Sequence, residues 1–200
     1  MNHVGGIVLC GGNSTRMGRS KAWLSIAGEL MLPRIVRILR VAVTPVVVVA
    51  AEDQELPPLP EGVEVVRDEE RGRGPLQGLA AGLAALQGRA EAAFASSCDV
   101  PFLRPAFVQR MIELLGSAHI CVPMTGGYYH PLAAVYRTEV LTVVHQLLQE
   151  NRLRPAHLFD WAPTRVVEAT ELVDVDPLLM SLRNVNTPEE YEQALRDLTS

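Results

Sequence analysis

Residues 6–21 read GIVLCGGNSTRMGRSK, a short apolar run that passes directly into a turn rich in glycine and cations. The run Gly6–Leu9 predicts a buried strand. Glycine has no Cβ to keep backbone N–H groups away from phosphate oxygens, while Arg16 and Lys21 supply charge that pairs with a polyphosphate. Open α/β sheets bind ligands at the carboxyl ends of their strands. The stretch therefore predicts a strand followed by an anion-binding loop.

The spacing in this loop differs from that of two common phosphate-binding motifs. From Gly12 the next glycine is six residues on, whereas a Walker A loop requires five, and Lys21 does not follow Gly18 directly. The Rossmann glycine spacing is also absent. A glycine-rich loop with two cations can equally be a solvated turn. The full string is far more specific: Leu9-x-Gly-Gly-x-x-x-Arg-Met-Gly-x-x-Lys21.

Along the rest of the chain, short apolar runs alternate with longer stretches of helical period. Strands are predicted at runs rich in β-branched residues: Gly6–Leu9, Val46–Ala50, Val63–Val66, Ala93–Ser97, Ile120–Pro123, Leu132–Tyr136 and Arg165–Glu168. Helices are predicted where apolar residues recur every three or four positions: Leu32–Val41, Leu76–Leu86, Ala106–Leu115 and Val140–Glu150. The alternation predicts an α/β fold, a Rossmann-like arrangement of three layers around a mostly parallel central sheet.

A last helix has the clearest start. Thr187 can cap it, Pro188 suits the first helical position, and Glu190 stands three residues after the cap to complete a capping box.

The composition limits the class of protein. The chain has 200 residues, 48% of them hydrophobic, which is enough for one full-sized core, so residues 1–200 are expected to form a single domain. The net charge is −5, from 18 basic and 23 acidic residues, which argues against nucleic acid or an anionic membrane as a partner. The three cysteines are far apart, and no apolar run has the length of a signal peptide or a membrane span. We expect a cytoplasmic protein with reduced thiols.

The first loop and three further segments resemble the molybdenum cofactor guanylyltransferases, which belong to a wider group of nucleotidyltransferases that includes sugar-nucleotide pyrophosphorylases. The further segments come in the family's order: Asp68 before residues 72–79 (GRGPLQGL), residues 98–101 (CDVP) after a strand, and residues 184–190 (NVNTPEE). The resemblance implies transfer of GMP from GTP to the terminal phosphate of molybdopterin, with release of pyrophosphate. Molybdoenzyme apoproteins or their chaperones would then receive the product.

Asp99 is the candidate metal ligand. Its carboxylate stands just past a predicted buried strand, where an uncompensated charge is costly. Magnesium takes hard oxygen ligands, commonly one or two carboxylates together with substrate phosphates. An aspartate that faces a polyphosphate loop meets that preference, so Mg²⁺ is the expected cofactor. The alternative is that Asp99 caps the helix after Pro101.

The resemblance also implies roles for the other residues of the site. Catalysis is expected from Arg16, Lys21 and Asp99. Nucleotide and cofactor binding is expected from a larger set: Leu9, Cys10, Gly11, Gly12, Lys21, Asp68 and Asp99. Asp68 stands at a strand end, where it accepts hydrogen bonds from the ribose or base or else binds a neighbouring backbone amide.

Three residues are weaker candidates for the acceptor side. His130 lies in a segment that the family places near the acceptor, but a lone histidine before proline is more often structural. Arg152 and Arg154 are candidates for the phosphate of the pterin, although cations after a helix end are also stabilised by the helix dipole.

The choice of base rests on small differences in sequence. Gly11-Gly12 resembles the guanine-specific members more closely than the cytosine-specific relatives, which read Ala-Ala-Gly. The chain departs from the family at Cys10, which replaces a usual alanine, and at Ala50-Ala51-Glu52, where guanylyltransferases carry an asparagine. Three other hypotheses stay open: a cytidylyltransferase for molybdopterin, a nucleotidyltransferase for a sugar 1-phosphate, and a non-catalytic module that carries molybdopterin to apoenzymes. The presence of both Lys21 and Asp99 argues against the last.

Overall fold

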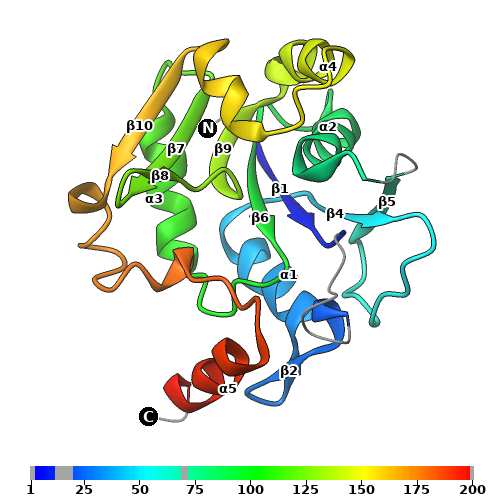
Figure 1. Cartoon of the computed structure of the whole chain (residues 1–200), viewed down its shortest axis with the longest axis vertical. Helices are drawn as coiled ribbons and strands as arrows, with labels where there is room; N and C mark the ends of the chain where they lie inside the picture. Colours follow the sequence, from blue (N-terminus) through cyan, green and yellow to red (C-terminus); the bar gives the residue numbers. More distant parts are fainter. Residues whose placement is uncertain (1–2, 12–19, 69–71, 199–200) are drawn as a thin grey trace.

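A twisted sheet runs through the centre of the computed structural model, which describes residues 3–11, 20–68 and 72–198 (Figure 1). Within this part of the chain, seven strands lie in the order β10-β7-β9-β6-β1-β4-β5, and the short strand β8 pairs with β7. The bounds are β1 Val4–Leu9, β4 Val46–Ala51, β5 Glu64–Asp68, β6 Ala92–Ser97, β7 Ile120–Thr125, β8 Tyr128–Tyr129, β9 Ala133–Arg137 and β10 Thr164–Glu168. Pairs in this sheet are parallel except those made by β8 and β9. The prediction of an α/β fold with a mostly parallel sheet is confirmed.

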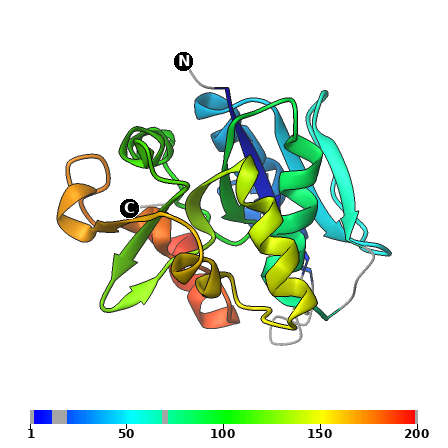
Figure 2. The same cartoon turned by 90° about the horizontal axis from the view of Figure 1, so that it is seen from above.

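Helices cover both faces of this sheet (Figure 2). On one face lie α1 (Met31–Ala42) and α3 (Pro105–Leu115), and on the other lie α2 (Gly74–Leu86) and α4 (Leu141–Gln149). Side chains alternate between the faces along each strand, so Val8 joins the α1–α3 core and Ile7 joins the α2–α4 core. The run Val46–Val49 is buried throughout because both faces are covered.

Two glycines let α2 lie close against β1. A Cβ at Gly82 would lie 2.6 Å from Cγ2 of Ile7, and one at Gly78 would lie 3.3 Å from Cδ2 of Leu9. Gly78 precedes Gly82 in the helix but lies beside Leu9, which follows Ile7 in the strand. The helix α2 therefore runs antiparallel to β1. Its amino-terminal end therefore points to the carboxyl edge of the sheet, and the helix dipole brings positive potential there.

The last part of the chain packs beside the start of the first helix. The hairpin β2–β3 (Ser25–Ile26 and Glu29–Leu30) and α5 (Pro188–Asp197) share a third buried cluster. The hydroxyl of Tyr191 donates a hydrogen bond to the carbonyl oxygen of Ser25. Short 3₁₀ turns lie between these elements: η1 Lys21–Trp23, η2 Thr138–Val140, η3 Pro155–Asp160, η4 Ala169–Glu171 and η5 Met180–Leu182.

All of the predicted strands and helices are present, and their ends differ from the predicted ones by at most two residues. The capping box of Thr187 and Glu190 is also present. The hairpin β2–β3 and strand β8 were not predicted, because strands of two residues are too short to show a period. No helix in the described ranges is long and apolar enough to cross a membrane.

Candidate functional site

Three segments that are distant in the sequence meet at the carboxyl edge of the sheet. Lys21 begins η1, Asp99 follows β6, and residues 184–186 precede α5. β1 lies between β4, to which the chain runs next in this sheet, and β6, which the chain reaches from β5 through α2, so the order of the strands reverses at β1. Ligands of open α/β sheets bind in the crevice at such a point. The meeting place is therefore a candidate ligand site on topology alone.

Lys21 bridges the other two segments. Its Nζ donates to Oδ2 of Asp99 at 2.6 Å and to Oδ1 of Asn186 at 2.7 Å. Asp99 is 8% exposed, and a buried carboxylate without partners would be costly. The ammonium group compensates this charge. One positive charge is thus held between two oxygen atoms from segments that are distant in the sequence.

The second oxygen of Asp99 is also fixed by neighbours. Its Oδ1 accepts from Oγ of Ser97 at 2.5 Å and from Nδ2 of Asn184 at 2.7 Å. The backbone N–H of Val185 donates to the carbonyl oxygen of Asp99 at 2.9 Å. These bonds orient the carboxylate and tie the segment before α5 to the end of β6.

A buried aspartate shapes the turn that leads to this segment. Asp176 is fully buried, and its two oxygens accept from the backbone N–H groups of Met180 at 3.1 Å and Ser181 at 2.7 Å. Ser181 Oγ in turn accepts from the N–H of Arg104, just before α3, at 3.1 Å. The turn is therefore anchored to α3 before the chain reaches Asn184.

The beginning of the glycine-rich loop is held from the side of β4. Cys10 N donates to the carbonyl oxygen of Val49 at 2.8 Å, which extends the ladder between β1 and β4 by one residue. Gln54 Nε2 donates to the carbonyl oxygen of Cys10 at 3.0 Å, and Gln54 Oε1 accepts from Ala51 N at 3.3 Å. Leu9 and Cys10 are buried, whereas Gly11 is exposed. Gly12 and Arg16, which complete the predicted loop, lie outside the described residues.

Asp68 lies at the same carboxyl edge of the sheet. It is the last residue of β5 and pairs in register with Ala51 of β4. Its neighbour Arg67 donates to the carbonyl oxygens of Ala51 at 3.0 Å and Gln54 at 2.8 Å. The residues predicted to bind nucleotide from β1, β5 and β6 therefore stand along one edge.

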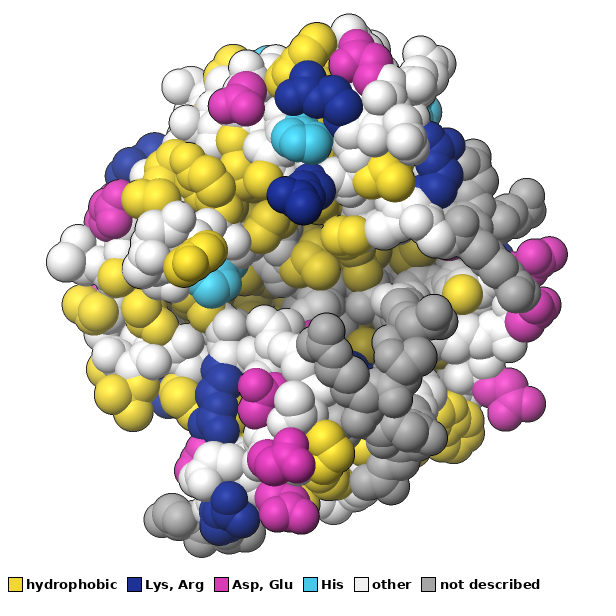
Figure 3. Space-filling view, in the orientation of Figure 1, with side chains coloured by type: hydrophobic (Ala, Val, Ile, Leu, Met, Phe, Trp, Pro, Cys, Tyr) yellow, Lys and Arg dark blue, Asp and Glu magenta, His cyan; other side chains and the backbone are white. Residues whose placement is uncertain are grey.

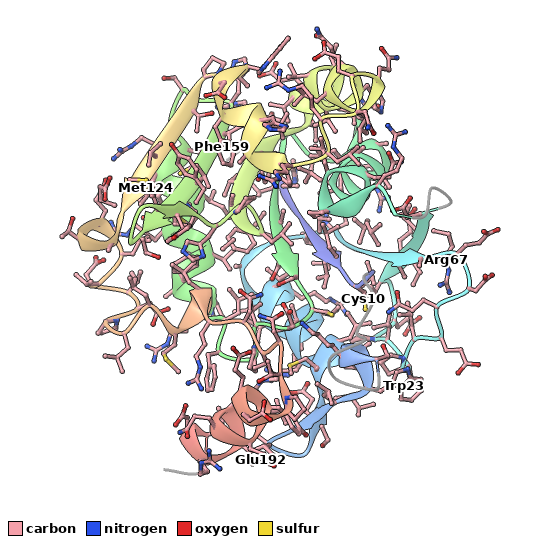
Figure 4. The ribbon with its side chains drawn as sticks, in the orientation of Figure 1. Cys10, Trp23, Arg67, Met124, Phe159 and Glu192 are labelled. Carbon is pink, nitrogen blue, oxygen red and sulfur yellow. The ribbon has the colours of Figure 1, made fainter. Side chains whose placement is uncertain are left out.

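The face drawn in Figure 3 is hollowed across its middle, with apolar side chains along the hollow and cations and histidines at its rim. Figure 4 places Cys10 on one side of this region and Phe159 and Met124 on the other. Tyr129 and Phe159 meet edge to face, with centroids 4.9 Å apart. The guanidinium of Arg152 lies 5.3 Å from the centroid of the Trp161 ring. Phe159 and its contact with Tyr129 thus give this side of the hollow flat aromatic surface, and Arg152 and Trp161 form a cation–aromatic pair.

His130 has a structural environment. Its Nε2 shares a hydrogen bond of 2.6 Å with Oγ1 of Thr125 across the β7–β8 turn. Burial lowers the pKa of His130, so the neutral form is favoured at neutral pH. The contact agrees with a role in holding the turn.

The chemistry of the site suits a metal that is shared with a substrate. Among the residues that the structure describes, no group of three or more His, Cys, Asp or Glu side chains is placed to hold an ion. Asp99 and Asn186 nevertheless direct two hard oxygen atoms at a single positive charge, that of Lys21. Mg²⁺ commonly takes few protein ligands and completes its shell with phosphates and water. The oxygen pair fits this pattern.

Four side chains in this arrangement were missing from the set predicted from sequence: Gln54, Ser97, Asn184 and Asn186. A signal for the two asparagines was present. Val185 is fully buried, and alternation along an extended segment turns its two neighbours the other way. Gln54 gave no comparable signal, because it follows β4 in an irregular segment.

Comparisons with known proteins find a family model and relatives that match this chain. The MobA-like NTP transferase domain matches residues 6–161. A molybdenum cofactor guanylyltransferase of Desulfosudis oleivorans is 33% identical over 196 residues, which covers 97% of this chain and 95% of the relative. The crystal structure of molybdopterin-guanine dinucleotide biosynthesis protein A from Archaeoglobus fulgidus superposes with a TM-score of 0.80, at 18% identity and 98% coverage of both chains.

One structural relative was crystallised with a metal. A protein of Mycobacterium tuberculosis in complex with manganese has a TM-score of 0.65 to this chain, at 18% identity, and the match covers 97% of this chain and 98% of the other.

Proposed function

The chain belongs to the MobA-like NTP transferase family, and from this membership we propose that it transfers GMP from GTP to the terminal phosphate of molybdopterin. The observation that supports the proposal best is the cluster of Lys21, Asp99 and Asn186, in which Lys21 is the last residue of the predicted anion-binding loop. It combines a cation for phosphate oxygens with oxygens for a divalent ion. Nucleotidyl transfer requires both, because its catalysis is mainly positioning and neutralisation of phosphate charge.

In the proposed reaction, an oxygen of the acceptor's terminal phosphate attacks the α-phosphorus of GTP in line. The bond from the α-phosphorus to the oxygen bridging the α- and β-phosphates breaks, and pyrophosphate leaves with that oxygen. The backbone N–H groups of Gly11 and Gly12 and the side chains of Arg16 and Lys21 bind the phosphates. No covalent intermediate with the protein is required.

Asp99 and Asn186 would hold Mg²⁺, which supplies positive charge that stabilises the pyrophosphate leaving group. With Mg²⁺ held there, Lys21 can exchange its partner. Its four-carbon side chain is flexible, so the ammonium group can leave the Asp99 carboxylate and pair with a phosphate oxygen of the nucleotide. Ser97 and Asn184 keep the carboxylate oriented during this exchange.

Guanine is the base that we propose, on the names of the curated relatives and on the Gly11-Gly12 turn. Gln54 supplies a carboxamide beside this turn, three residues beyond Ala51, although the asparagine expected after β4 is absent. Asp68 is assigned to the ribose. For the acceptor, we propose the pair of Arg152 and Trp161, which combines a cation with a flat aromatic ring.

The test is an assay of pyrophosphate release over the four common NTPs, with and without molybdopterin. We expect release only with GTP, a divalent cation and molybdopterin together. Release with a sugar 1-phosphate in place of molybdopterin would reassign the acceptor. Release with CTP and molybdopterin, but not with GTP and molybdopterin, would reassign the base. No release under any condition would support a carrier without catalytic activity and contradict the proposal.

A further inference from the structure

Two of the three cysteines stand next to each other at the base of the site. β1 and β6 are parallel neighbours with Leu9 opposite Ser97, and the N–H of Cys98 donates to the carbonyl oxygen of Leu9 at 3.1 Å. The pairing therefore continues past both strand ends, and Cys10 and Cys98 are the next residues on the two sides. Neighbouring strands lie about 4.8 Å apart. That spacing falls within the Cα separation of roughly 4.4–6.8 Å that disulfides span.

The two thiols also point to the same face. Cys10 and Cys98 both belong to the buried cluster beneath α1 and α3, and they are 6% and 5% exposed. The two thiols therefore enter the same part of the core from neighbouring strands.

We propose that Cys10 and Cys98 form a redox-active dithiol, which hydrogen peroxide closes to an intramolecular disulfide that inactivates the site. The proposal goes beyond nucleotidyl transfer, because it assigns a site of covalent modification to side chains that the reaction does not use. Its effect on turnover rests on the proposed function, whereas the disulfide itself does not.

The chemistry balances with peroxide as the oxidant. The sulfur of Cys10, as thiolate, attacks one oxygen of hydrogen peroxide; the O–O bond breaks, and the products are a sulfenic acid and hydroxide, which takes up the thiol proton as water. The sulfur of Cys98 then attacks the sulfenic sulfur, and a second water leaves with the Cys98 proton. Both sulfurs are oxidised by one electron each, and peroxide is reduced to two waters.

Closure would change the site because each cysteine adjoins a residue of it. Cys10 precedes Gly11 of the loop, and Cys98 precedes Asp99. A disulfide holds its sulfurs about 2.05 Å apart, much closer than two thiols in contact. Cys10 Sγ also lies 3.4 Å from Nε2 of Gln54, so movement of this sulfur disturbs the contact that holds the turn. Cys121 is a natural control, since β9 separates its strand from β6 and burial raises the pKa of its thiol to about 12.

The first experiment needs no activity. The native protein is treated with hydrogen peroxide, free thiols are alkylated under denaturing conditions, and peptides are analysed without reduction. We expect one linked pair, Cys10 with Cys98, whose mass has lost two hydrogens, and an alkylated Cys121. Sulfinic acids without a linked pair, or a link that includes Cys121, would overturn the proposal.

The second experiment compares pyrophosphate release before and after peroxide, with each variant measured against its own untreated sample. The native chain and Cys121→Ala should lose most of their activity and regain it with dithiothreitol, whereas Cys10→Ala, which lacks the sulfur that peroxide attacks first, should show no loss that a thiol reverses. An equal, reversible loss in Cys10→Ala would contradict the proposal. If untreated protein releases no pyrophosphate, the proposed function fails, and the linked peptide still decides the fate of the dithiol.

Discussion

Asp99 accepts hydrogen bonds on both carboxylate oxygens, from Lys21 on one and from Ser97 and Asn184 on the other. Asp99→Asn keeps the shape, removes the charge and leaves one oxygen as an acceptor, while its NH2 group faces the donors on the other side. Its turnover as a function of Mg²⁺ concentration separates the proposed metal role of Asp99 from a structural role.

We expect Asp99→Asn to lower turnover by on the order of 10²-fold or more, comparable to the loss of one preorganised electrostatic group. The fold should survive, and circular dichroism checks this. Pyrophosphate release is measured over a range of Mg²⁺ concentrations, with Asp174→Asn as the control because Asp174 is exposed and pairs with Arg110 away from the site. Normal turnover of the variant at limiting Mg²⁺ would make Asp99 a structural residue.

Gln54 is the residue on which base selection is expected to depend. A buried polar group left unpaired by the wrong base costs about 1–3 kcal/mol, so two such groups favour GTP over CTP by roughly 30-fold or more. We expect Gln54→Ala to reduce this ratio by about tenfold, the equivalent of one lost hydrogen bond of about 1.4 kcal/mol.

The measurement is calorimetric binding of GTP and CTP with Mg²⁺ and without acceptor, so that acceptor preference does not enter. Gln87→Ala is the control, since Gln87 is an exposed residue at the end of α2. If Gln54→Ala weakened both nucleotides equally, Gln54 would hold the turn without reading the base. Equal affinities of the native chain for GTP and CTP would contradict guanine specificity.

Among the elements, α5 positions the site from outside the sheet. The carboxylate of Glu190 accepts from the N–H groups of Asn186 at 2.6 Å and Thr187 at 3.2 Å, so the capping box also fixes the backbone of a residue that binds Lys21. The residues at the start of α5 therefore also form part of the site. Local helix chemistry is thereby connected to the geometry around Asp99.

Glu190→Ala should therefore lower both stability and activity. The loss of a cap costs typically about 1 kcal/mol in the free energy of unfolding, measured by urea titration. Pyrophosphate release should fall with it, because Asn186 is less well held. Glu192→Ala, an exposed substitution in the same helix, controls for the change of charge (Figure 4). A variant with lowered stability and full activity would show that the cap serves the helix alone.

At the scale of the whole molecule, a ligand in this crevice contacts segments from the first and last parts of the chain, so it should stabilise the fold. At about 100 times its dissociation constant, GTP with Mg²⁺ contributes roughly 2.7 kcal/mol. For a chain of this size that raises the Tm by roughly 5–10 °C. CTP at the same concentration should give a clearly smaller rise, and EDTA should remove much of the effect of GTP. A thermal scan with equal shifts for all four NTPs would contradict base selection.

The sequence predicted the fold well because most of its elements carry their own period. The valine run at residues 46–49 indicates a strand that is covered on both faces, and the three- and four-residue spacing in α1 indicates a helix that packs on the sheet. Both patterns are local and do not depend on the rest of the chain. Lys21 and Asp99 were both predicted for the site, Lys21 as a cation of the loop after the first strand and Asp99 as a carboxylate just past a buried strand. Gln54 was missed as a site residue because its position depends on where an irregular segment crosses the sheet edge, and no local pattern records that. Asn186 lies in the segment 184–190 that the family resemblance includes, but it was given no role.

Lys21 is the only lysine in the 200-residue sequence, and every other cationic side chain that stays charged at neutral pH is an arginine. The protein's single side-chain amine therefore lies inside the site, hydrogen-bonded to Asp99 and Asn186. Reagents that acylate amines, and enzymes that modify lysine, have one side-chain target here, and neutralising it removes the cation proposed to bind phosphate. A dye or surface attached through lysine would occupy the crevice itself, so labelling of this protein is better directed to another kind of side chain.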